Sequence, residues 1–99
     1  MANIRRVAKT VRECVRAAGL DFRHSYVDKR EDHWRIKLGS RGLNEAERNR
    51  IERDILSRLN DAGVKYRSAG FDPLLMSRCP SPQHTHLVYH PFVVRIPYE

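Results

Sequence analysis

The chain has 99 residues, which is enough for one compact domain with a modest hydrophobic core but too few for a multidomain enzyme. Its 19 Lys and Arg outnumber 12 Asp and Glu, which gives a formal net charge of +7 with neutral histidines. Hydrophobic residues make up 40% of the chain, and this share excludes a disordered basic tail. No apolar run approaches the roughly 20 residues of a membrane span, and two cysteines are too few for a disulfide-stapled secreted domain. We therefore expect a cytoplasmic protein that does not associate with membranes.

The first predicted element is an amphipathic helix that begins after Asn3, a favourable N-cap, and ends before Gly19. Its buried face consists of apolar residues at helical spacing, namely Ile4, Val7, Ala8, Val11, Cys14, Val15 and Ala18. Its cations form a basic ridge beside that face, and they are Arg5, Arg6, Lys9, Arg12 and Arg16. Four of the five fall within an arc of roughly 60°, while Arg6 lies about 100° from Arg5. Because the rest of the chain would have little core without this helix, we expect a structural element and not a targeting segment.

Residues 22–27 and 33–38, which are joined by a charged turn, alternate between apolar and polar side chains and predict a β-hairpin. The core side of this hairpin is expected to hold Phe22, Tyr26, Trp34, Ile36 and Leu38. The outer face is expected to hold Arg23, Ser25, His33, Arg35 and Lys37. An antiparallel sheet often leaves one face in water, so a solvated face is the simplest interpretation. Its cations and its lack of acidic residues also suit a binding surface.

A second helix is predicted from Asn44, which forms a capping-box pattern with Glu47, to the residue before Gly63. Its buried stripe is expected to comprise Ile51, Ile55, Leu59 and Ala62. The expected ion pairs at i,i+4 spacing are Arg48–Glu52, Arg50–Asp54 and Asp54–Arg58. Residues 43–63 contain four cations and five acids, whereas residues 1–42 contain 11 cations and five acids. The excess positive charge therefore belongs to the first helix and the hairpin, and we expect no nucleic-acid contact from the second helix.

The last third of the chain predicts two further strands, residues 64–68 and 87–96, and Pro91 either bends the second strand or confines it to a sheet edge. Between them we expect an irregular loop over residues 73–86 with a short helical turn near its start. The whole chain is thus predicted to form one α+β domain of order α-β-β-α-β-β, with both helices on one face of a short antiparallel sheet. Prolines flank Phe92–Ile96, which suits an edge strand, so we expect a monomer or a weak homodimer formed through this strand.

Cys79, His84 and His86 are the candidate metal ligands of the chain. A His-x-His pattern on a strand places both imidazoles on one face, about 6.6 Å apart at the backbone, which suits zinc. However, two prolines separate the cysteine from the histidines, and the chain contains neither paired Cys-x-x-Cys motifs nor a His-Glu-x-x-His helix. The favoured interpretation is ordinary polar strand residues, and we expect no cofactor.

No catalytic motif is recognisable, because the chain lacks a Walker loop, a Gly-x-Ser-x-Gly motif and a nuclease signature. Metal-independent RNA cleavage is chemically feasible for His24 or His33 with Arg35 and Tyr26, since it needs only an acid–base pair and cations. These residue types are common on any basic surface. We therefore expect a binding protein and keep the ribonuclease as a lesser alternative.

The favoured hypothesis is a small basic module that contacts the phosphate backbone of nucleic acid through the helix ridge and the hairpin face. Its candidate binding residues are Arg5, Arg6, Lys9, Arg12, Arg16, Arg23, Arg35 and Lys37. The alternative is a non-catalytic interaction or inhibitor protein, such as a phage-type or accessory factor, that docks the same surface on an acidic partner. A nucleic-acid-handling complex would offer both phosphates and acidic protein patches to such a surface.

Overall fold

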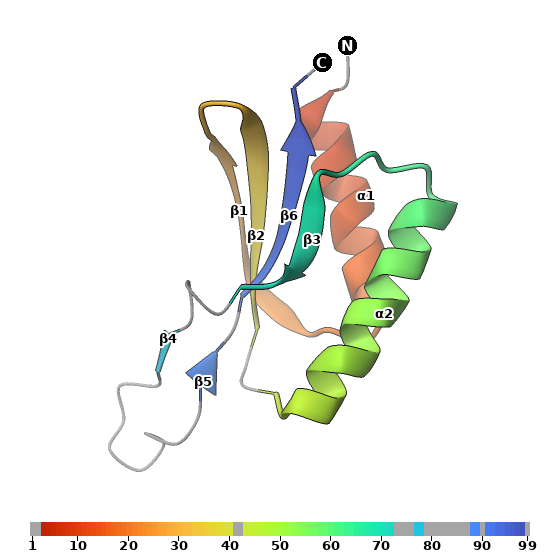
Figure 1. Cartoon of the computed structure of the whole chain (residues 1–99), viewed down its shortest axis with the longest axis vertical. Helices are drawn as coiled ribbons and strands as arrows, with labels where there is room; N and C mark the ends of the chain where they lie inside the picture. The colour runs from red at the N-terminus through yellow and green to blue at the C-terminus, as the bar shows by residue number, and fades with distance from the viewer. Residues whose placement is uncertain (1–2, 41–42, 73–76, 79–87, 90, 99) are drawn as a thin grey trace.

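The computed structural model describes residues 3–40, 43–72, 77–78, 88–89 and 91–98 of the chain. Its helices are α1 (Ile4–Ala17) and α2 (Glu45–Asp61). The main sheet has four antiparallel strands in the order β1-β2-β6-β3, comprising β1 (Phe22–Lys29), β2 (His33–Ser40), β6 (Phe92–Pro97) and β3 (Ser68–Phe71). A separate two-stranded sheet pairs β4 (Ser77–Arg78) with β5 (Val88–Tyr89). Both helices lie on the same face of the main sheet (Figure 1), which confirms the predicted α+β fold and element order.

Local capping residues fix both helix ends at the positions that the sequence predicts. Asn3 Oδ1 accepts a hydrogen bond from the amide two residues on (3.0 Å), and Asn44 Oδ1 accepts one from the amide three residues on (2.8 Å). After the C-terminal ends, Gly19 and Gly63 adopt φ values of 93° and 73°, which favour glycine. The first and last residues of each helix are therefore set by local interactions and do not depend on packing against the sheet.

The hydrophobic core lies between the two helices and the inner face of the sheet. Its buried residues are Ala8, Val11, Cys14, Val15, Leu20, Ile36, Leu38, Ile51, Ile55, Leu59, Phe92, Val94 and Ile96. The predicted α2 stripe is confirmed apart from Ala62, which is exposed at the C-cap of the helix. Of the predicted α1 stripe, four residues are buried, whereas Ile4, Val7 and Ala18 are only partly buried and pack against the core. Trp34 packs against the edge of this core, as its alternation with Ile36 predicts.

The closing strand β6 is an interior strand, so the predicted edge strand at Phe92–Ile96 is wrong. Val93 pairs with Lys37 of β2 on one side and with Gly70 of β3 on the other. Pro91 precedes the strand and Pro97 ends it, so neither proline removes an amide from the middle of the ladder. The edges of the sheet are β1 and β3, and the expected homodimer through β6 has no free edge to use.

The predicted third strand over residues 64–68 begins instead at Ser68. The amide of Val64 donates to the carbonyl of Leu59 and completes the C-cap of α2, so it is not available for sheet pairing. The predicted final strand over residues 87–96 is interrupted, because β5 and β6 are separate strands in different sheets. Ser77–Arg78 form β4 and not the end of a helical turn, while residues 73–76 and 79–87 lie outside the described residues.

A β-bulge in β1 reverses the expected facing of that strand. The pairing with β2 shifts between Phe22 and His24, so one extra residue is inserted and the alternation of faces changes phase. Ser25 consequently lies opposite Leu38 of the core face, whereas Tyr26 lies opposite Lys37 on the outer face. The prediction that Tyr26 faces the core is wrong, and its side chain is 56% exposed.

Candidate functional site

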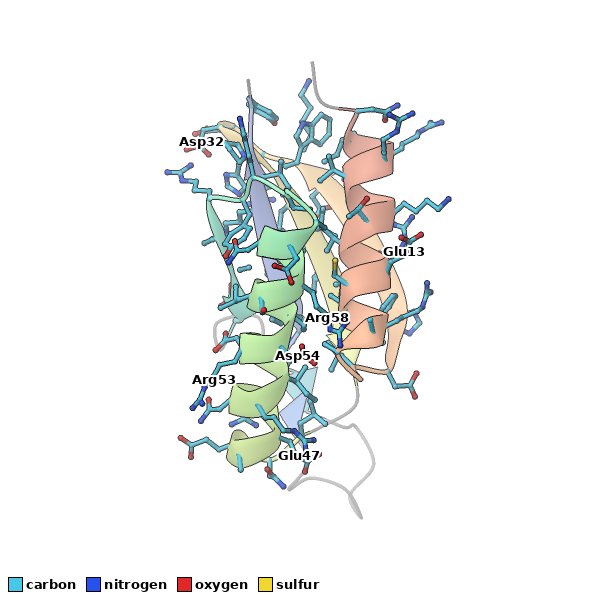
Figure 2. All side chains as sticks on the ribbon, turned by 90° about the vertical axis from the view of Figure 1, so that its right-hand side faces the viewer. Glu13, Asp32, Glu47, Arg53, Asp54 and Arg58 are labelled. Carbon is cyan, nitrogen blue, oxygen red and sulfur yellow. The ribbon has the colours of Figure 1, made fainter. Side chains whose placement is uncertain are left out.

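The basic ridge predicted on the first helix is present on α1, and we call its cations the α1 ridge: Arg5, Arg6, Lys9, Arg12 and Arg16. Four of these side chains are exposed and Arg12 is partly buried. The apolar stripe of α1 is packed in the core, so the ridge lies on the outside of the helical layer, where long side chains extend away from α2 (Figure 2). Glu13, which is labelled there, is the only acidic residue of α1.

No carboxylate among the described residues forms an ion pair with a cation of the α1 ridge. Elsewhere among the described residues, four arginines are paired, in the ion pairs Arg35–Asp28 (2.7 Å), Arg58–Asp54 (3.0 Å), Arg95–Asp72 (3.1 Å) and Arg67–Asp32. A paired arginine must give up its carboxylate before it can bind an external anion with full charge. The α1 ridge therefore presents positive charge that is available to a ligand.

The outer face of the hairpin is separated from the α1 ridge by the sheet itself. Ile36 and Leu38 point into the core beneath the helices, so the alternating residues Arg35 and Lys37 point to the opposite face. Asp28 also lies on this face, contrary to the expectation that it holds no acid, and its Oδ2 accepts hydrogen bonds from Nε (3.2 Å) and Nη2 (2.7 Å) of Arg35. This pair, in which two arginine nitrogens donate to one carboxylate oxygen, offsets the charge of Arg35 within the fold.

The other two candidate binding residues of the hairpin, Lys37 and Arg23, give weaker support to a binding surface than the ridge does. Lys37 is partly buried and forms no ion pair with the rest of the described chain. The backbone of Arg23 lies at the register shift of β1, and its side chain is outside the described part. The structure thus brings together the five cations of the α1 ridge and places Arg35 and Lys37 on the other side of the sheet.

An exposed aromatic pair on β1 was missed by the sequence reasoning. The rings of His24 and Tyr26 are stacked with 6.3 Å between their centroids and 20° between their planes. The bulge creates this pair by turning Tyr26 outward, and no local sequence pattern marks the position of a bulge. Trp34, which the sequence places on the core side of the hairpin, packs against the core and makes an edge-to-face contact with Tyr98.

The residues of the ribonuclease alternative, either His24 or His33 with Tyr26 and Arg35, are only partly brought together. His24 lies beside Tyr26, with 6.3 Å between the ring centroids, whereas Arg35 is paired with Asp28. His33 lies six residues along β2 from Gly39, the residue opposite His24, which is about 20 Å of extended strand. His33 instead contacts Asp32 (2.6 Å), and the hydrogen bond from Arg67 together with that from His33 lowers the pKa of Asp32 to about 2.

The outer surface of α2 is electrostatically mixed, as the sequence predicts. Of its three predicted ion pairs, the described residues form Asp54–Arg58, which lies between the helices in Figure 2. Glu52 instead accepts a hydrogen bond from the amide of Phe71 (3.3 Å) at the edge of β3. A shallow depression on α2 has a mixed lining of Ala46, Asn49, Arg50, Arg53 and Asp54.

The candidate metal ligands Cys79, His84 and His86 lie outside the described residues. Within the described residues, no group of three His, Cys, Asp or Glu side chains is arranged to hold a metal ion. Neither of the described helices has the length and apolar character needed to cross a lipid bilayer. No protein-family model matches the sequence, and no curated protein shows significant similarity to it.

Proposed function

We propose that the protein binds the phosphate backbone of nucleic acid through the α1 ridge. The observation that carries this proposal is that four of the five ridge cations are exposed and none of the five forms an ion pair with a described carboxylate, although four other described arginines do. Arginine and lysine side chains supply most of the sequence-independent affinity of nucleic-acid-binding proteins. Within the described residues, the contact that the fold gives a ridge cation is that of Arg16 with the Phe22 ring, and this contact leaves the positive charge without a counter-ion.

The dimensions of the ridge suit a run of phosphates. Eleven residues separate Arg5 from Arg16, which corresponds to about 16 Å along a helix axis. This length corresponds to about five base steps along the axis of a duplex, at 3.4 Å per step. The helix is held by its buried stripe, so the cations are arranged before the ligand arrives and only their side chains must be ordered on binding.

The hairpin cations are a secondary part of this proposal. Arg35 is already neutralised by Asp28, so it contributes little charge to a ligand. Lys37 retains its charge but faces the other side of the sheet. We therefore expect the affinity for phosphates to depend mainly on α1. The binding surface is then smaller than the helix ridge and hairpin face that the sequence predicts.

Charge reversal on the two helices tests the proposal with a matched control. The double variant Arg5→Glu with Lys9→Glu and the double variant Arg50→Glu with Arg53→Glu change the net charge equally, and all four side chains are exposed. We expect the α1 variant to lose binding to fluorescently labelled DNA or RNA at low salt, while the α2 variant retains it. Equal losses in both variants would mean that net charge alone acts.

Two further outcomes of this experiment would replace the proposal. If the wild-type protein binds neither duplex nor single-stranded probes at low salt, the ridge has another ligand. Binding of an acidic protein that the same α1 variant abolishes, without any binding of nucleic acid, would favour the interaction-protein alternative.

A further inference from the structure

His24 and Tyr26 form an aromatic pair on the edge strand β1, on the face of the sheet that the helices do not cover. Tyr26 is 56% exposed, His24 is exposed, and the two rings are stacked nearly parallel. The helices cover the opposite face of the sheet, so no helix lies over this pair. In the middle of the outer face, by contrast, Val93 of β6 is fully buried and not accessible to a ligand. Two flat, accessible rings are therefore concentrated at the β1 edge.

The two rings have one neighbour on β2 without a side chain and one that adds positive charge. His24 lies opposite Gly39, and a Cβ placed on this glycine would meet the Cβ of His24 at 3.8 Å. Apart from the adjoining residues of β2, no other atom of the described residues lies within 4 Å of that position. Tyr26 lies opposite Lys37, whose ammonium group forms no ion pair with the described residues. A planar ligand with a nearby negative charge fits this arrangement.

The same edge of the sheet connects the pair to the α1 ridge. The guanidinium of Arg16, the last cation of the ridge, lies 4.7 Å from the centre of the Phe22 ring. Phe22 begins β1, and after the bulge that follows it His24 and Tyr26 lie on the outer face. His24 is two residues further along, which is about 7 Å of extended strand. A flexible chain that follows the ridge can thus pass the β1 edge and reach the rings.

We propose that His24 and Tyr26 form a stacking platform for the bases of single-stranded nucleic acid, whose phosphates lie on the α1 ridge. This inference rests on the proposed function and adds to it a preference for single strands. Bases stack on exposed aromatic rings with little regard to sequence, because every base has a π-face. In a duplex the same faces are buried in the base stack, so a duplex uses the ridge alone.

The experiment compares two single-stranded probes of equal length and charge. One is a fluorescently labelled oligothymidylate and the other is an abasic oligodeoxynucleotide, which offers the same phosphates without bases. We expect the wild-type protein to bind the oligothymidylate at least about fivefold more tightly. Tyr26→Ala should remove this difference, and Tyr26→Phe should preserve it because phenylalanine retains the ring.

A matched control on the same strand excludes a general effect of changing β1. Val27 is 40% exposed and follows Tyr26, but it lies opposite Ile36 on the other face of the strand. Val27→Thr keeps the β-branched shape and should leave the preference for the oligothymidylate unchanged. Thermal unfolding of each variant establishes that the fold is retained.

The outcomes separate this inference from the proposed function. Equal binding of the two probes by the wild-type protein, or an undiminished preference in Tyr26→Ala, would overturn the platform and leave the α1 ridge as a backbone site. A complete absence of binding to both probes and to a duplex would overturn the proposed function and the platform with it. A preference that only Tyr26→Ala removes supports the platform.

Discussion

α1 and α2 contact each other on one face of the sheet, yet α1 is strongly basic whereas the charges of α2 are mixed. α1 carries five cations and one acid, and within the described chain none of these cations forms an ion pair. α2 carries four cations and five acids, of which Asp54 pairs with Arg58 and Glu52 binds the edge of β3. The charges of α2 are thus used partly inside the molecule, whereas those of α1 are directed to solvent. Under the proposed function, both helices contribute to stability and α1 alone binds the ligand.

The largest expected effect is a loss of stability from the core beneath α2. Leu59 is completely buried, and Leu59→Ala should lower the free energy of unfolding by about 2–5 kcal/mol, as measured by urea denaturation. Arg53→Ala on the exposed side of the same helix should change it by less than about 0.5 kcal/mol. Under conditions where Leu59→Ala remains folded, its affinity for nucleic acid should equal that of the wild type. A specific loss of affinity in the folded variant would contradict the division between the helices.

A smaller effect on stability is expected from the hydrogen bond between Glu52 of α2 and the backbone of β3. Glu52 accepts the amide hydrogen of Phe71, so Glu52→Ala should cost about 1 kcal/mol of stability and accelerate hydrogen exchange at that amide. Glu52→Gln keeps an oxygen acceptor and should retain most of the protection. If all three proteins exchange this amide at the same rate, Glu52 has no such role.

The smallest expected effect concerns the acid range of pH. The pKa of Asp32 is lowered from 3.8 to about 2 by hydrogen bonds from Arg67 and His33. A carboxyl whose pKa is lower in the folded state stabilises the fold above pH 3.8, and this stabilisation is lost as the pH falls through about 2. Asp32→Asn should therefore reduce the slope of melting temperature against pH in that interval. An unchanged slope would show that these hydrogen bonds do not persist in solution.

The parts of the fold that were predictable from the sequence depend on local signals. The helix limits are set by residues that act only on nearby backbone, namely the N-caps Asn3 and Asn44 and the glycines Gly19 and Gly63. A short stretch of sequence is therefore enough to predict them. The apolar stripe of α1 is likewise a local signal, because it follows from the spacing of residues within the helix. It determines which face of α1 is buried and therefore which face carries the ridge. The candidate site on α1 was therefore accessible to prediction.

The features that were missed depend on contacts between distant segments. The interior position of β6 follows from pairing with both β2 and β3, and Pro91 and Pro97 do not reveal it because they stand at the strand ends. The bulge after Phe22 changes the face of Tyr26, and the pairing of β1 with β2 brings Asp28 to Arg35. A sequence pattern with an unmarked bulge predicts the wrong face for the rest of the strand.

The salt dependence of binding tests the central claim most directly, because each phosphate contact contributes about one unit to the slope of log K against log[salt]. The neutral double variant Arg5→Gln with Lys9→Gln should bind more weakly and should reduce the magnitude of this slope by about two units. The corresponding variant of α2, Arg50→Gln with Arg53→Gln, should leave the slope unchanged. An unchanged slope in the α1 variant, or an equal reduction in both, would contradict the assignment of the phosphate contacts to the α1 ridge.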